Sequence, residues 1–147
     1  MGSPHDMIAD RADFFAEHMA QDNIVCAILL VLYDLQMPVN CIGFDYLEIM
    51  IPYAFHNRVM IDTNGLYESV CRQYPRADYN SVENAVTRAI QKAWKTRNGG
   101  RWHLYFPEYV LQRKKPPTNT EFIKSIMYFM DMWQDRCVKE ASLCESK

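Results

Sequence analysis

An unbroken apolar stripe at helical spacing, in the middle of the chain, constrains the fold more than any other feature of the sequence. Its members recur at the i, i+3, i+4 and i+7 intervals of one helix face: Val82, Ala85, Val86, Ala89, Ile90, Ala93 and Trp94. This regularity predicts an amphipathic helix over about residues 79–97, with the apolar face buried. Either Asp78 or Asn80 can cap its start, and Asn80 with Glu83 has the spacing of a capping box.

Helical periodicity also dominates the rest of the chain, whereas strand signals are weak. Further helices are expected over 8–20, 23–36, 42–56, 62–74 and 121–140, with a short helix or irregular segment over 103–112. Pro52 predicts a kink or a break inside the third of these. Thr118 and Glu121 give the last helix a capping box. The predicted fold class is all-α, a bundle of about six to seven helices that contains a helix-turn-helix.

One domain accounts for most of the chain. We assign residues 23–147 to it and treat residues 1–22 as an N-terminal extension, either a short helix or partly residues added for expression. The longest apolar run, Ile24 to Tyr33, is about half of the ~20 residues that a membrane span needs. The acidic N-terminus lacks the basic start of a signal peptide. We therefore predict a cytoplasmic protein without a membrane partner.

Catalytic and metal-binding chemistry finds little support in the sequence. The five cysteines form no CxxC pair, and Cys26 and Cys71 fall on apolar helix positions, which predicts reduced, buried thiols. The four histidines lack zinc-site spacing, and no phosphate-binding loop or serine-nucleophile motif is present. We predict a non-enzymatic protein with no catalytic residue, no metal and no cofactor.

Positive charge is concentrated around the striped helix. Residues 72–115 contain ten Lys and Arg against three acidic residues, a net charge of +7, whereas residues 1–71 carry −8. The near-neutral total of −2 conceals this separation. A basic block on a helical framework is typical of a nucleic-acid-binding surface, although an ordinary solvated helix has the same general appearance.

The polar face of the striped helix has the order of residues that major-groove reading requires, with short hydrogen-bonding side chains first and cations after them. We predict that the base-reading residues are Ser81, Glu83, Asn84, Thr87 and Arg88. We predict that the phosphate-binding residues are Gln91, Lys92, Lys95, Arg113, Lys114 and Lys115. The expected partner is double-stranded DNA, which would place the bound protein on the nucleoid.

Several stretches resemble the C-terminal DNA-binding effector domain of the sporulation initiation transcription factor, the stage-zero response regulator of endospore-forming bacteria. They are residues 32–38, 43–47, 66–67 with Val70, 81–85, 88–94 and 115–123. The most specific are Ala-Ile-x-x-Ala-Trp at 89–94 and Pro-Thr-Asn-x-Glu-Phe-Ile at 117–123. The similarity spans about residues 28–126.

The resemblance implies a six-helix effector domain that binds DNA sequence-specifically, as a homodimer or tandem dimer, and controls sporulation genes. The family has Glu-Arg where this chain has Glu83-Asn84, and Arg-His where it has Thr87-Arg88. A bidentate Arg–guanine pair is worth about 1–3 kcal/mol of discrimination, so we expect a changed or relaxed operator. The family also has an N-terminal phosphoacceptor receiver domain, which residues 1–22 do not resemble, so we do not carry over phosphorylation control.

A second hypothesis belongs to another functional class. In it, the chain is a non-enzymatic protein-interaction module that keeps the fold but has lost operator reading. It would pair with a related regulator through its first and last helices. The departures at Asn84 and Thr87 and the acidic N-terminal third of the chain motivate this alternative.

Overall fold

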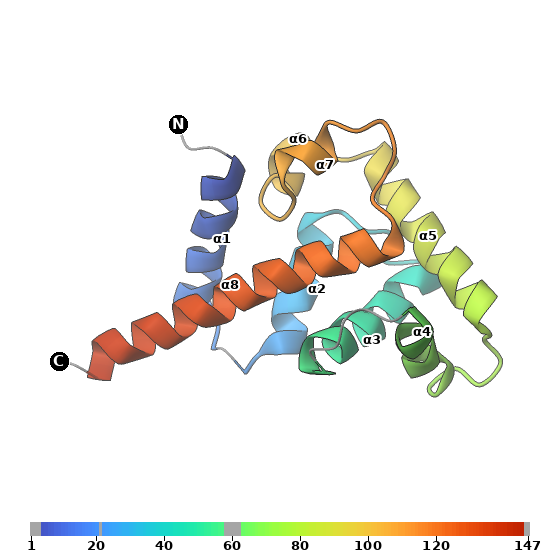
Figure 1. The fold of residues 1–147 in the computed structure, drawn as a ribbon, viewed down its shortest axis with the longest axis horizontal. Helices are drawn as coiled ribbons and strands as arrows, with labels where there is room; N and C mark the ends of the chain where they lie inside the picture. Colours follow the sequence, from blue (N-terminus) through green and yellow to red (C-terminus); the bar gives the residue numbers. More distant parts are fainter. Residues whose placement is uncertain (1–3, 21, 58–62, 146–147) are drawn as a thin grey trace.

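The computed structural model describes residues 4–20, 22–57 and 63–145, and these residues form helices and connecting turns without a strand. The elements in chain order are α1 (Pro4–His18), α2 (Ile24–Asp34), α3 (Ile42–Asn57), α4 (Thr63–Cys71), α5 (Tyr79–Lys95), α6 (Gly99–Trp102), α7 (Glu108–Leu111) and α8 (Asn119–Glu145). Figure 1 shows their arrangement. The predicted all-α class is confirmed, and the larger number of elements reflects two four-residue helices, α6 and α7.

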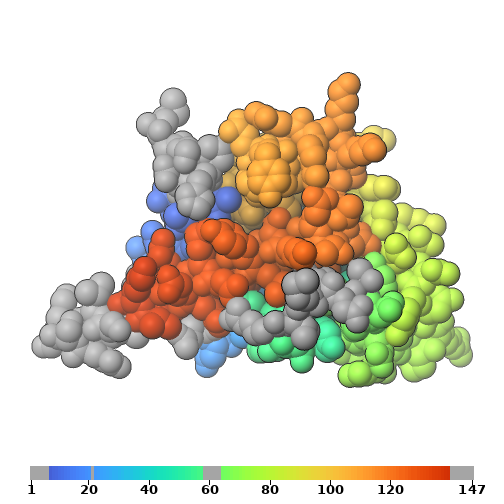
Figure 2. Space-filling model, viewed as in Figure 1, coloured from blue at the N-terminus to red at the C-terminus, as the bar shows by residue number. Residues whose placement is uncertain are grey.

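The longest helix, α8, organises the bundle. It contacts α1, α2, α3 and α5, and in Figures 1 and 2 it runs across the middle of the molecule, with its N-terminal end near α5. Its inward face is fully buried at helical spacing, through Phe122, Ile123, Ile126, Phe129, Met130 and Trp133. The predicted capping box at its start is confirmed. The Thr118 N–H donates to Glu121 Oε1 at 3.0 Å, and the Glu121 N–H donates to Thr118 Oγ1 at 3.2 Å.

The N-terminal helix α1 packs on α8. Ile8, Ala12 and Phe15 are buried, and the Phe15 ring meets the Phe129 ring edge to face at 4.9 Å. At the other side of this contact, Arg136 Nε lies 2.8 Å from Asp13 Oδ1. The predicted short helix in the N-terminal extension is therefore part of the same hydrophobic core as the rest of the chain.

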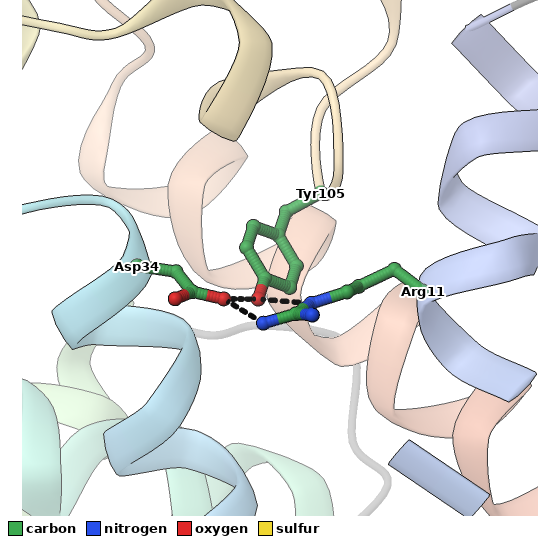
Figure 3. A network of polar contacts seen from close by, with 3 residues as sticks. All are labelled: Arg11, Asp34 and Tyr105. Carbon is green, nitrogen blue, oxygen red and sulfur yellow. Dashed lines mark hydrogen bonds and ion pairs between the residues drawn. The ribbon is translucent and has the colours of Figure 1, made fainter. Parts of the chain in front are cut away.

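A half-buried polar network ties α1 to α2 and to the segment between α6 and α7 (Figure 3). Arg11 Nε donates to the Tyr105 hydroxyl at 3.1 Å, Arg11 also pairs with Asp34, and the Tyr105 hydroxyl donates to the same carboxylate. Burial raises the pKa of Tyr105, and its bond to Asp34 raises it further. The three side chains come from α1, from the end of α2 and from the segment between α6 and α7, so they join elements that are distant in sequence.

Helix α2 is apolar on every side but is buried on only one. Ala27, Ile28, Val31 and Leu32 are buried, whereas Val25, Leu30 and Tyr33 are exposed. Cys26 lies on the exposed side, so its predicted burial is wrong. Periodicity cannot assign a buried face to a helix that lacks a polar one.

Helix α2 ends in a Schellman motif that holds a non-glycine residue in the left-handed region. The Met37 N–H donates to the Leu32 carbonyl at 3.1 Å, and the Gln36 N–H donates to the Tyr33 carbonyl at 2.9 Å. Gln36 has φ of 57°, which glycine adopts freely but other residues adopt at a cost. The burial of Leu32 and Met37 on either side holds this turn in place.

Helix α3 continues through Pro52 from Ile42 to Asn57, so a break into two helices does not occur, whereas the kink stays a prediction. Ile51, Ala54 and Phe55 on either side of the proline are buried. Core packing of both halves offsets the hydrogen bond that the proline cannot make.

Helices α3 and α5 touch backbone to backbone at Gly43. A Cβ atom on Gly43 would lie 2.3 Å from the Ala85 carbonyl oxygen and 2.9 Å from Ala89 Cβ. Both obstacles belong to rigid parts of α5, so no side-chain rotation can make room. The absence of a side chain at Gly43 therefore sets the distance between the two helices.

We expect Gly43→Ala to lower the free energy of unfolding by about 2 kcal/mol or more, because the added methyl group forces the α3 and α5 backbones apart. Chemical denaturation monitored by circular dichroism measures the change. Gly99→Ala is the matched control, since a Cβ there meets nothing within 4 Å. Equal stabilities of the two variants would contradict the close contact.

We expect Gln36→Gly to raise the free energy of unfolding by about 1 kcal/mol, because glycine adopts the left-handed conformation without a steric penalty. The same substitution at Gln112, where φ is −81°, should lower stability, since glycine there adds entropy to the unfolded chain and removes the hydrogen bond from Gln112 Nε2 to Glu108 Oε1. Denaturant midpoints of the two variants should move in opposite directions. A shift of both in the same direction would contradict this account of the α2 terminus.

Candidate nucleic-acid interface

The start of α5 is fixed by a capping box that lies two positions before the predicted Asn80–Glu83 pair. The Ser81 N–H donates to Asp78 Oδ1 at 2.7 Å, and the Asp78 N–H donates to Ser81 Oγ at 3.0 Å. Asp78 is therefore the cap, and the predicted Asn80–Glu83 box is wrong because Asn80 is already inside the helix. The Ser81 hydroxyl also donates to the Asp78 carbonyl at 2.9 Å, so this predicted base reader is engaged at the helix start.

The apolar stripe of α5 is buried as predicted. Val82, Val86, Ala89, Ile90, Ala93 and Trp94 lie in the core, and Ala85 is half-buried under Gly43. The ring of Trp94 meets that of Trp102 edge to face at 5.5 Å, which joins the end of α5 to α6. Both indoles are buried, so neither is a base-stacking surface.

The opposite side of α5 is an exposed polar ridge made of Asn84, Arg88, Gln91 and Lys95. These positions are spaced at i, i+4, i+7 and i+11, which places them along one line of a helix. In Figure 2 the residues from green to yellow, which include α5, form one edge of the molecule. The ridge thus combines an amide and a guanidinium in its first turns with an amide and an ammonium in its later turns.

The two flanks of this ridge contact other elements. On one flank, Lys92 Nζ lies 3.9 Å from Cys41 Sγ at the start of α3. On the other flank, the Thr87 hydroxyl donates at 3.2 Å to Oδ1 of Asn119, the first residue of α8. The Glu83 side chain is exposed on the Thr87 flank, while its backbone carbonyl accepts from Asn119 Nδ2 at 3.3 Å.

The basic segment 113–117 lies beside this second flank. Arg113 Nη1 is 2.9 Å from Glu121 Oε2, so this predicted phosphate ligand is already paired within the protein. The pKa of Glu121 is lowered, first by its hydrogen bond from the Thr118 backbone and then by the Arg113 guanidinium. Lys114 and Lys115 are exposed. Two of the three predicted cations of this segment therefore face solvent.

A groove of about 500 Å³ separates α5 from the segment that leads into α8. It is lined by Tyr67, Glu83, Thr87, Gln91, Lys115, Pro116, Pro117, Thr118, Asn119 and Thr120. Sequence reasoning did not identify Tyr67 and Asn119 as part of this site. Asn119 lies inside the Pro-Thr-Asn-x-Glu-Phe-Ile motif at 117–123, but nothing in the local sequence indicates that this motif contacts α5.

The described residues contain no cluster of three or more His, Cys, Asp and Glu side chains that could hold a metal ion. Within the same ranges, no helix combines the length and the apolar character that crossing a bilayer requires.

Comparison with known proteins gives one informative result. No solved structure matches the chain. The family model described as sporulation initiation factor Spo0A C terminal matches residues 28–130, which include all of α3 to α7, most of α2 and the first part of α8. This is a family of DNA-binding transcription factor domains and not of enzymes. The match covers well over half of the chain, and the chain therefore belongs to the Spo0A C-terminal family, the DNA-binding effector domains of sporulation regulators.

Proposed function

We propose that the protein is a sequence-specific DNA-binding transcription regulator in which α4 and α5 act as a helix-turn-helix and α5 enters the major groove. The observation that carries the proposal is the ridge of Asn84, Arg88, Gln91 and Lys95, all of which are exposed on one side of α5. A recognition helix needs such a ridge on one side and a buried stripe on the other. Membership of the family supports the same assignment.

Within this proposal, the first turns of α5 read bases. Asn84 is suited to a bidentate contact with adenine, and Arg88 to one with guanine. Ser81 and Thr87 already have partners within the protein, since Ser81 holds the helix start and Thr87 is bonded to Asn119. The Glu83 carboxylate, which is exposed, is suited to accept from cytosine N4.

The phosphate contacts come from the later turns of α5 and from the adjoining segment. Gln91, Lys92 and Lys95 hold one strand, and Lys114 and Lys115 flank the groove on the α8 side. Arg113 contributes by positioning this segment through Glu121. We propose that the protein acts on the nucleoid in the cytoplasm and binds as a homodimer or tandem dimer.

The alternative is a protein-interaction module that pairs through its first and last helices. In the structure, the apolar face of α1 is buried against α8 within the same chain. This contact uses surface that the alternative assigns to a partner, and so favours DNA binding. Co-purification of a related regulator, with no DNA affinity at low salt, would instead support the alternative.

We expect DNA affinity to fall steeply with salt. If Arg88, Lys92, Lys95, Lys114 and Lys115 neutralise about five phosphates, log K should decrease with log salt at a slope of about −4 to −5. Fluorescence anisotropy titrations of labelled duplex DNA between low and moderate salt measure the slope. An affinity that does not change with salt, or no binding at low salt, would refute the proposed function.

Asn84→Ala and Lys95→Ala remove side chains from the two ends of the same exposed ridge and should act differently. Asn84→Ala should change the preferred sequence, at a cost of about 1–3 kcal/mol at one base pair. Lys95→Ala should weaken binding to all sequences alike and reduce the salt slope by about 1. Selection from a random duplex library, followed by titration of selected and random DNA, separates the two effects. Identical effects on both kinds of DNA would contradict the assigned roles.

A further inference from the structure

The side-chain amide of Asn119 joins three helices at the edge of the proposed DNA-binding surface. Its Oδ1 accepts from the Thr87 hydroxyl of α5 at 3.2 Å, and its Nδ2 donates to the Glu83 carbonyl of α5 at 3.3 Å. The same Nδ2 lies 3.5 Å from the Tyr67 hydroxyl of α4. Asn119 is half-buried and is the first residue of α8. One amide therefore holds the α4–α5 pair against α8.

The chemistry of these partners fixes the direction of every hydrogen bond. A backbone carbonyl can only accept, so the NH2 group of Asn119 must point toward Glu83. The carbonyl oxygen of the amide then points toward Thr87, and an amide oxygen can only accept. The single hydroxyl proton of Thr87 is consequently committed to Asn119. Thr87 Oγ1 can therefore only accept any further hydrogen bond.

Thr87 can still be approached from outside the protein. It is only partly buried, and it lines the groove of about 500 Å³ together with Glu83 and Gln91. It lies one turn beyond Glu83 and one position before Arg88, at the margin of the exposed ridge. A base edge that contacts Arg88 or Glu83 would pass close to Thr87.

We propose that Asn119 is a positioning residue that sets sequence preference through Thr87, by making its hydroxyl an obligatory hydrogen-bond acceptor. This inference rests on the proposed entry of α5 into the major groove. A free threonine hydroxyl can donate to guanine or thymine or accept from adenine or cytosine. With its proton committed, Thr87 can accept only from the amino group of adenine N6 or cytosine N4. The strand that faces Thr87 must therefore present adenine or cytosine at that position.

The test is selection of binding sites from a random duplex library by the full chain and four variants. Thr87→Val removes the hydroxyl while it preserves the shape, and Asn119→Ala releases the hydroxyl proton. The double variant Thr87→Val/Asn119→Ala completes a cycle. Thr120→Ala is the control, because it removes a hydroxyl from the same groove outside this network.

We expect the unmodified chain to prefer adenine or cytosine at one position by about two- to tenfold, the range of a single net hydrogen bond. Asn119→Ala should admit guanine and thymine there, and Thr87→Val should lose the preference at the same position. In the Thr87→Val background, Asn119→Ala should have no further effect on that position. Thr120→Ala should select the same sites as the unmodified chain.

Two results would overturn the inference while leaving the proposed function in place. One is a selected motif that Thr87→Val leaves unchanged, and this comparison holds even if Asn119→Ala fails to fold. The other is an Asn119→Ala variant that binds all sequences more weakly by the same factor, which is the effect expected if Asn119 has a purely structural role. Loss of salt-dependent DNA binding by the unmodified chain would instead refute the proposed function itself.

Discussion

The direct backbone contact between α3 and α5 at Gly43 is the constraint on which the presentation of α5 depends. Because a Cβ at this position would overlap the Ala85 carbonyl, α5 can lie against α3 only with its small residues turned inward. That orientation buries the stripe that runs from Val82 to Trp94 and turns the ridge of Asn84 and Lys95 to solvent. The polar face is therefore defined by packing as well as by helical periodicity.

Helix α8 holds this arrangement from the opposite side. At its start, Glu121 caps the helix and pairs with Arg113, while Asn119 bonds to α5. Further along, Phe129 packs against Phe15 of α1. Phe129 lies inside the region that the family model covers, and Phe15 lies outside it. Helix α1 is in turn joined to α2 through the Arg11 network. The N-terminal helix and the family domain therefore share one core.

Most of the fold could be predicted from the sequence, because amphipathic periodicity is a local property. The stripe of α5, the all-α class and the Thr118–Glu121 cap were confirmed. Predictions failed where a local pattern allowed two outcomes. Asn80–Glu83 and Asp78–Ser81 both fit cap spacings, Pro52 is tolerated when both sides of the helix are packed, and Cys26 lies on a helix that has no polar face. The predicted roles of individual residues in DNA binding stay predictions.

The sequence by itself determined which residues lie on the inner and outer faces of α5 and where positive charge accumulates, because spacing along one helix and formal charge need no tertiary information. Only the tertiary structure decided which of the predicted contact residues are available to a ligand. Ser81, Thr87 and Arg113 all have the chemistry of contact residues, yet each has a partner within the protein. The partner of Thr87 lies in α8, 32 residues further along the chain, and a hydrogen bond between segments distant in sequence has no signature in either segment alone.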